Sequence, residues 1–378
     1  MMTLFFLLLI LLIYIYFLYP LVLSLKRVDE VSGDFPSDTI LPFVSIIVPA
    51  YNEEKQIVEK LQNTFAQDYP KDRYEILVTS DGSTDATVAL AKALEDKRVR
   101  VIENTERKGK NHAINKALTE VRGEILVFTD ANALFSTNAL TKLVNPFGDP
   151  TVGLVCGRLH YLKGEGTHVG KGEGLYFRYE SWIKRQESRW GAVSVVTGAI
   201  YAIRRELATL LEPDVANDFA HPVQVGSKGY KVVFEPDAVA LERATESLQE
   251  EFHRRVRIVT RGFTAFGKYW KKYGLLQGKR GFCFVSHKLL RWFAPIFLLG
   301  LFLSNLFLLE NAFFLVTLWA QVLFYVTAVF GIFVKRRIPK ILVIPFYFCM
   351  INLAALVGFF LYLRGKRQSV WNVAASTR

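Results

Sequence analysis

The sequence of 378 residues predicts an α/β domain joined to membrane-spanning helices. Two observations predict this fold class. Short apolar runs rich in β-branched residues alternate with helix-like segments, which is typical of a parallel sheet covered on both faces. Elsewhere, four blocks without any charged residue, at 1–25, 292–309, 311–334 and 341–363, approach or exceed the roughly 20 residues that cross a bilayer.

The first block, residues 1–25, predicts an uncleaved signal anchor. Two basic residues follow it and none precedes it, so the positive-inside rule places the next domain in the cytoplasm, at the cell's inner or plasma membrane. Residues 292–363 predict about three further spans. The basic tail, residues 364–378, would then lie outside against the same rule. Either the last block is re-entrant at Pro345, or the tail is an exception.

The net charge of +12 is concentrated in residues 251–291, which hold eleven Lys or Arg and one acid. Aromatic residues recur among these lysines at helical spacing, at Phe263, Phe266, Tyr269 and Tyr273. This pattern predicts an interfacial helix with its aromatics toward lipid and its lysines toward anionic headgroups. A solvated charged helix beside the membrane is the alternative. No nucleic-acid-binding signature accompanies the segment, so we expect no nucleic-acid partner.

The α/β domain is predicted over residues 26–250. Its first strands are expected at 44–49, 75–79, 99–102 and 124–129. A glycine-rich run at 164–174 predicts a flexible loop. The three cysteines form no CxxC pair, which argues against a disulfide framework and a zinc module. The six histidines have no metal-ligand spacing, so we expect them to be packing or surface residues.

Ligands of such sheets lie beyond the carboxyl ends of the strands. The residues there include Glu53 after the first strand, Asp81 after the second, Lys110 before the fourth and Asp130 after it. Carboxylates suit ribose and base, lysine suits phosphate, and an acid can hold a divalent metal on a diphosphate. The collection therefore suits a sugar nucleotide.

Simpler roles remain open for three of these positions. Lys110 follows a glycine, and a basic residue beside a glycine often means only an exposed loop. Asp81 and Gly82 form a common turn pair. Asp130 is either a helix cap or a ligand holder, and because Ser136 and Thr137 offer other caps for the next helix, we favour the functional role.

Seven motifs in order resemble glycosyltransferase family 2. They are VPAYNE at 48–53, SDGSTD at 80–85, GKNHAIN at 109–115, FTDAN at 128–132, VTGAIYAIRR at 196–205, ND at 217–218 and RRVR at 254–257. The flanking apolar blocks resemble the membrane-integrated branch, with hyaluronan, chitin-oligosaccharide and poly-N-acetylglucosamine synthases and related exopolysaccharide glycosyltransferases. The resemblance implies a GT-A fold, in which a Rossmann-like mixed sheet binds the nucleotide beside an acceptor-binding half.

The resemblance also implies donor-binding roles. The nucleoside pocket would be lined by Pro49, Tyr51, Glu53 and Asp81, Lys110 would help to hold the nucleotide, and Asp130 would bind the metal-diphosphate as the first acid of the DxD motif. Here the second acid of that motif is Asn132, which brings no negative charge to a site for Mg²⁺ or Mn²⁺.

Further matches concern acceptor and catalysis. Gly198 lies in the segment that borders the acceptor, and Asp218 matches the general base. A simpler role for Asp218 is the N-cap of a helix over 219–229, and the order of the motifs favours the base. Arg254 and Arg257 lie in the Q-x-x-R-W motif, over diphosphate and acceptor. That motif keeps its arginine but lacks its glutamine and tryptophan, which leaves processivity open.

The predicted function is an inverting transfer of sugar from a nucleotide sugar, expected to be a UDP-sugar, to a saccharide or lipid-linked acceptor in envelope or exopolysaccharide synthesis. The reaction requires a base, such as Asp218, that accepts the proton of the acceptor hydroxyl. It also requires the metal and an arginine to offset the negative charge of the departing nucleoside diphosphate. One alternative is a processive polysaccharide synthase that exports its product. Another is a non-catalytic membrane scaffold with a degraded transferase domain, which only Asn132 favours.

Overall fold

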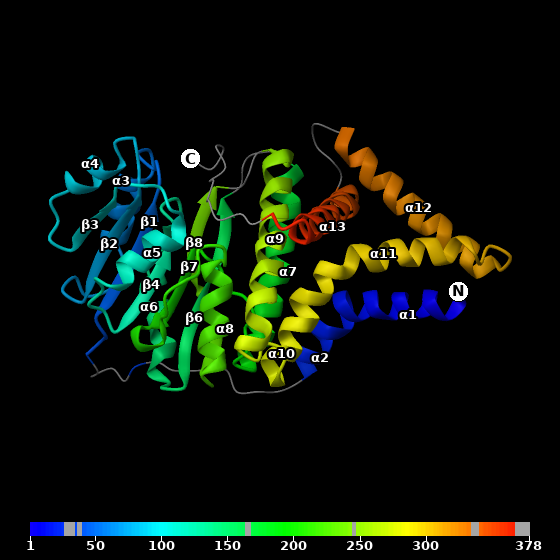
Figure 1. The fold of residues 1–378 in the computed structure, drawn as a ribbon, viewed down its shortest axis with the longest axis horizontal. Helices are drawn as coiled ribbons and strands as arrows, with labels where there is room; N and C mark the ends of the chain where they lie inside the picture. The colour runs from blue at the N-terminus through cyan, green and yellow to red at the C-terminus, as the bar shows by residue number, and fades with distance from the viewer. Residues whose placement is uncertain (26–34, 36–39, 163–167, 244–246, 334–339, 367–378) are drawn as a thin grey trace.

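The computed structural model describes residues 1–25, 35, 40–162, 168–243, 247–333 and 340–366. A mixed sheet occupies one side of the molecule and apolar helices occupy the other (Figure 1). Two long helices, α7 (His168–Arg189) and α9 (Leu248–Lys272), lie between these parts in the same view.

The sheet has eight strands in the order β3-β2-β1-β4-β7-β6-β8-β5. Their bounds are β1 Val44–Ala50, β2 Tyr74–Asp81, β3 Val99–Asn104, β4 Ile125–Thr129, β5 Leu134–Phe135, β6 Val152–Leu162, β7 Ile200–Arg204 and β8 Lys231–Arg243. β1 pairs in parallel with β2 and β4, and β2 with β3, which confirms the predicted first strands. β7 is antiparallel to β4 and β6, so the sheet is mixed.

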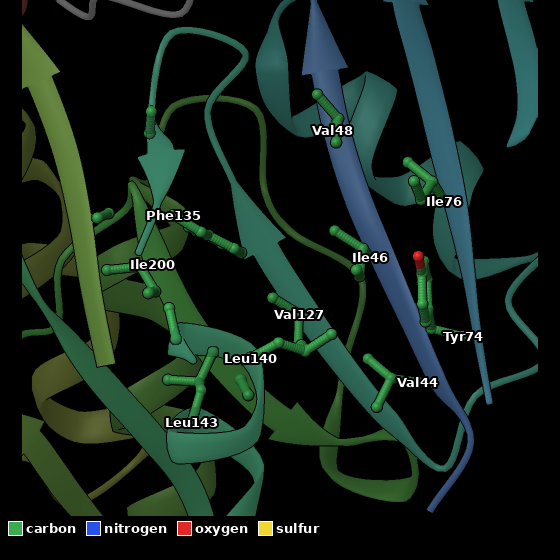
Figure 2. Packing of buried hydrophobic residues seen from close by; sticks show 14 of the residues in the cluster. Val44, Ile46, Val48, Tyr74, Ile76, Val127, Phe135, Leu140, Leu143 and Ile200 are labelled. Carbon is green, nitrogen blue, oxygen red and sulfur yellow. The ribbon is translucent and has the colours of Figure 1, made fainter. Parts of the chain in front are cut away.

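Both faces of the sheet are buried, as near-continuous apolar strands require. Ile46 belongs to the cluster that Figure 2 shows, with Val127, Phe135 and Leu140. The next residue, Ile47, belongs to the cluster on the other face, because successive side chains of a strand point to opposite sides.

Helices from different parts of the chain cover these faces. The first cluster includes residues of α3 (Ile57–Phe65), α4 (Thr87–Lys92) and α6 (Ala139–Val144). The second includes residues of α5 (Lys110–Leu118), α8 (Asn217–Ser227), α9 and α10 (Gly278–Phe284). Short 3₁₀ turns lie at Asn145–Gly148 and Arg205–Leu207.

Four helical segments are long and apolar enough to cross a membrane: Met2–Leu25, Gly278–Leu306, Ala312–Gly331 and Leu342–Leu363. This confirms one N-terminal and three C-terminal apolar segments. The elements concerned are α1 (Met2–Ile13), α2 (Tyr19–Leu25), α11 (Leu290–Leu306), α12 (Ala312–Phe333) and α13 (Lys340–Leu363), with π-helical turns at Tyr14–Leu18 and Val285–Leu289. α1 packs along α11, and α13 continues through Pro345 as one helix. Most of the basic tail lies outside the described residues.

Two sequence-based interpretations are corrected. Phe263 and Tyr269 of α9 do not face lipid, because both are buried and Phe263 packs against Phe359 of α13. Trp270, which is 38% exposed, is not covered in this way. The glycine-rich run is not a loop from residue 168 onward, since α7 begins there, while residues 163–167 lie outside the described part.

Candidate active site

The loops after β1 and β2 hold each other at the carboxyl edge of the sheet. The backbone amide of Thr84 donates to Asn52 Oδ1 at 2.8 Å, and the amide of Asn52 donates to Ser83 Oγ at 3.2 Å. The Glu53 amide donates to Thr87 Oγ1 at 2.8 Å. These contacts fix the segment in which the predicted donor-binding residues Pro49, Tyr51 and Glu53 lie. Asn52, with a φ of 53°, was not predicted as a site residue.

Asp81 fixes the loop that leads into α5. Its carboxylate accepts hydrogen bonds from the amides of Lys108 at 2.9 Å and Gly109 at 2.9 and 3.0 Å. Gly82 has a φ of 70°, and a Cβ there would lie 2.8 Å from the Arg107 nitrogen. Glycine is therefore required at this turn. The turn interpretation of the Asp81–Gly82 pair is correct, and a contact of Asp81 with a nucleoside stays a prediction.

Lys110 begins α5 and its Nζ forms an ion pair with Asp130, directly after β4. Asp130 does not cap a helix, because α6 begins later with Asn138 as its N-cap. Beneath this pair, the buried Lys60 Nζ donates to Thr129 Oγ1 at 2.9 Å. Burial lowers the pKa of Lys60 to about 7, against the opposing attraction of Asp130 and Glu242.

The residues around Asp130 fit a divalent metal that is shared with a substrate. Within the described ranges, no three His, Cys, Asp or Glu side chains group as a metal cage. Mg²⁺ sites in phosphate-handling proteins commonly use one or two carboxylates and complete the shell with phosphates and water. The Asp130 carboxylate is 20% exposed and offers a hard oxygen donor at this edge, and Asn132 follows it two residues later in the sequence.

Asp218 lies in the first turn of α8 and is not the N-cap, which is Ala216. A Cβ on Gly198 would lie 3.6 Å from Asp218 Oδ2, so the glycine leaves one side of the carboxylate open. Burial raises the pKa of Asp218, while the charges of Arg261 and Lys110 oppose the shift. A raised pKa makes a carboxylate a better proton acceptor near neutral pH.

Three arginines lie along one side of α9, at the i, i+3 and i+7 positions 254, 257 and 261. Arg254 donates to Glu251 Oε2 at 2.7 Å and to the Tyr161 hydroxyl at 2.8 Å. Burial lowers the pKa of Arg257 to about 10. Burial also lowers the pKa of Arg261, and the negative charge of Asp218 opposes this shift.

A cavity of about 910 Å³ joins the two halves of the molecule. Its lining includes six of the predicted site residues: Lys110, Asp130, Gly198, Asp218, Arg254 and Arg257. It does not include Pro49, Tyr51, Glu53, Asp81 or Asn132, which lie at the ends of β1 and β2 or in the loops after β1 and β4. From Asp218 the lining continues to Tyr16 of the π-helical turn Tyr14–Leu18, Arg291 of α11 and Tyr347 of α13.

Other polar residues of the lining were not predicted. Lys184 of α7 donates to Thr197 Oγ1 at 2.8 Å, next to Gly198. Arg261 and Arg291 also line the cavity. The helical spacing of Arg261 from Arg257 was a usable sequence signal. Lys184 and Arg291 gave none, because they reach the site only through the packing of their helices.

The fold and this site define a glycosyltransferase of the GT-A type. The structure is similar to a mannosyltransferase from Pyrobaculum calidifontis, PcManGT, solved in complex with GDP-Man and Mn²⁺. The two share 25% sequence identity with a TM-score of 0.73, and the match covers 96% of this chain and 100% of the other.

Residues 45–210 match the model of glycosyl transferase family 2, so the chain carries a domain of this family. A probable glycosyltransferase of Bacillus subtilis, YdaM, is 26% identical over 285 residues, which are 72% of this chain and 67% of the relative. A beta-monoglucosyldiacylglycerol synthase of Nostoc is 27% identical over 240 residues, 61% of this chain and 51% of that protein. The poly-beta-1,6-N-acetyl-D-glucosamine synthase of Staphylococcus aureus is 25% identical over 252 residues, 65% and 59% of the two chains. The chain thus spans little more than half the length of the last two relatives.

Proposed function

We propose that the protein is a membrane-bound inverting glycosyltransferase that moves a sugar from a nucleotide sugar to an acceptor held at the membrane. The observation that carries this proposal is the single cavity that holds Asp130 and Asp218 and continues to the apolar helices. The catalytic domain would lie on the cytoplasmic side of the cell membrane, as the basic residues that flank the apolar segments favour.

The donor is expected at the carboxyl edge of β1, β2 and β4. Tyr51 and Glu53 would face the nucleoside, and Lys110 would hold a phosphate oxygen in place of its contact with Asp130. Asp130 and Asn132 would hold Mg²⁺ or Mn²⁺, which when bound offsets the negative charge of the diphosphate. The Mn²⁺ of the related mannosyltransferase supports a divalent metal here.

Asp218 is the proposed base. An acceptor hydroxyl attacks the anomeric carbon, its proton passes to the Asp218 carboxylate, and the bond to the diphosphate oxygen breaks as the glycosidic bond forms. The nucleoside diphosphate leaves with the bonding electron pair, and Arg257 stabilises its growing charge. Attack opposite the leaving group inverts the anomeric centre, so an α-linked donor yields a β-linkage.

The cavity favours an acceptor that is carried by lipid. Beyond Asp218 its lining includes Ile258 of α9 and Val343, Ile344 and Ile351 of α13, which suit an apolar chain. The glucosyldiacylglycerol synthase among the relatives supports a lipid acceptor. The poly-N-acetylglucosamine synthase supports a second candidate, a processive synthase whose product leaves through the same cavity. The donor class is expected to be a UDP-sugar, and the GDP-Man of the related structure makes GDP-sugars the first alternative.

Turnover of UDP- and GDP-sugars by the purified full chain with Mn²⁺ or Mg²⁺, with membrane lipid extract as acceptor, tests the proposal. We expect transfer by the wild type and a loss of about 10³-fold or more in Asp218→Asn, with unchanged nucleotide binding. The matched control is Asp72→Asn, an exposed residue outside the cavity, which should keep wild-type activity.

Normal turnover by Asp218→Asn would refute the base assignment. No turnover of any donor by the wild type would favour the scaffold alternative. Sizing of the products separates single addition from polymer synthesis, and the anomeric configuration of the new bond tests inversion.

A further inference from the structure

A charged cluster lies where the cavity reaches the apolar helices. We call Glu180, Glu187, His287, Lys288 and Arg291 the membrane-end cluster; Glu180, His287, Lys288 and Arg291 line the cavity. Glu180 accepts from Lys288 Nζ at 2.7 Å and from Arg291 Nη1. His287 lies with Nδ1 at 2.8 Å from Glu187 and Nε2 at 3.1 Å from Glu180.

Arg291 has hydrogen-bonding capacity that the cluster does not use. Its Nε and Nη2 are buried, and no acceptor for them exists among the described residues. The rings of Tyr179 and Tyr16 lie 4.9 and 5.8 Å from the guanidinium carbon, which fixes the group in place. A buried donor without an acceptor costs free energy, and a guanidinium edge matches two oxygens of one phosphate.

Lys288 and Arg291 belong to the apolar segment Gly278–Leu306. His287 of the same segment faces a carboxylate with each ring nitrogen. Charged residues in apolar membrane helices are rare and commonly mark a binding site.

The helix α7 gives the order of groups along the cavity. Lys184 lies at the catalytic end, by Thr197. Glu180 lies four residues earlier, or about 6 Å along the helix, and Tyr176 a further ~6 Å on. The Tyr176 ring lies 6.2 Å from that of Tyr347 on α13. Glu180 of the cluster therefore lies on α7 between Lys184, at the catalytic end, and Tyr176, beside α13.

We propose that the membrane-end cluster binds a phosphate of the acceptor, so that the acceptor is a lipid whose saccharide is joined to the apolar chain through phosphate. The inference rests on the proposed transferase function. An anion in this middle position must be bonded to the saccharide on one side and to the apolar chain on the other. A phosphate that is linked to both, as a phosphodiester, keeps its negative charge. A carboxylate cannot itself be such a link, because its ester carries no charge.

Binding can be measured without catalysis. The full chain in phosphatidylcholine nanodiscs is titrated with radiolabelled methyl dodecyl phosphate, an anionic phosphodiester, and with dodecyl glucoside, an uncharged amphiphile with the same chain. We expect the wild type to bind the phosphodiester about tenfold more tightly or better, because charge-assisted hydrogen bonds are worth that much. Arg291→Gln should lose this preference.

Two further variants guard against misfolding. Glu180→Gln removes the carboxylate that competes for Arg291 and Lys288, so it should bind the phosphodiester more tightly than the wild type, which misfolding cannot mimic. Arg291→Lys keeps the charge and should retain part of the preference. Arg364→Gln, an exposed basic residue at the end of α13, is the control for general attraction and should bind as the wild type does.

Equal binding of both amphiphiles by the wild type, or an unchanged preference in Arg291→Gln, would overturn the phosphate site. Retained phosphate preference without turnover of any donor would overturn the transferase function and leave this anion site standing.

Discussion

Asp218 and the cations around it control each other's ionisation. Burial raises the pKa of Asp218, and the positive charges of Arg261, Lys110 and Lys184 limit that rise. The proposed base must be ionised to accept a proton, so its pKa sets the acid limb of the rate profile.

Arg261→Gln removes the largest of these opposing charges, so the pKa of Asp218 should rise further. We expect the acid limb of kcat to move to higher pH than in the wild type. The measurement is kcat against pH for the wild type, Arg261→Gln and the control Lys272→Gln, an exposed lysine on the same helix. Superimposable limbs would show that Arg261 does not act on the base.

His221 lies on α8, the helix that also carries Asp218. It is predicted to make stability depend on pH. It is fully buried, its Nδ1 lies 2.9 Å from the Tyr201 hydroxyl, and burial lowers its pKa from 6.5 to about 4. Between these values the unfolded chain binds a proton that the folded chain does not, so stability falls as pH drops from about 6.5 to about 4. His221→Asn should flatten this dependence of the thermal midpoint. Equal slopes in both proteins would contradict the assignment.

At the scale of elements, α9 is clamped to α13 through one buried carboxylate. Glu251, 0% exposed, accepts from Arg255 Nε at 2.7 Å and from the Tyr347 hydroxyl at 2.8 Å. Arg255 in turn donates to that hydroxyl at 2.9 Å. The clamp holds the helix with the site arginines against a membrane helix.

Loss of one partner from a buried pair leaves a charge without compensation. Glu251→Gln should therefore destabilise the protein by about 3 kcal/mol. Glu103→Gln breaks the exposed pair with Lys92 and should cost about 1 kcal/mol or less. Chemical unfolding of both variants in detergent measures the difference. Similar losses of unfolding free energy in the two variants would mean that the clamp contributes no more to stability than an exposed ion pair.

The elements differ in how far the sequence predicted them. The first strands were predictable, because apolar runs and their turn residues are local signals. The helical start of α7 was not, since its glycines favour a loop. Phe263 and Tyr269 show the same limit, because an apolar stripe does not reveal whether lipid or protein covers it.

At the scale of the whole molecule, the arrangement predicts one orientation in the membrane. By the positive-inside rule, the basic residues at the start of the segment Gly278–Leu306 should keep that end inside, and the following turn would then lie outside. In a chain with its three cysteines replaced by serine, Glu310→Cys should react with an impermeant maleimide in intact cells. Lys71→Cys, on an exposed loop of the sheet domain, should react only after permeabilisation. The reverse pattern would refute the cytoplasmic placement.

The sequence by itself determined the α/β class, the four apolar segments and the candidate residues at the carboxyl edge of the sheet. These follow from local hydrophobic patterns and from ordered motifs. Tertiary structure alone decided that Asp218, Arg261, Lys184 and Arg291 share one cavity, and that Glu180 and His287 meet at its membrane end. Those residues come from α7, α8, α9, α11 and the π-helical turn before α11. Their side chains meet only when long-range packing brings the helices together.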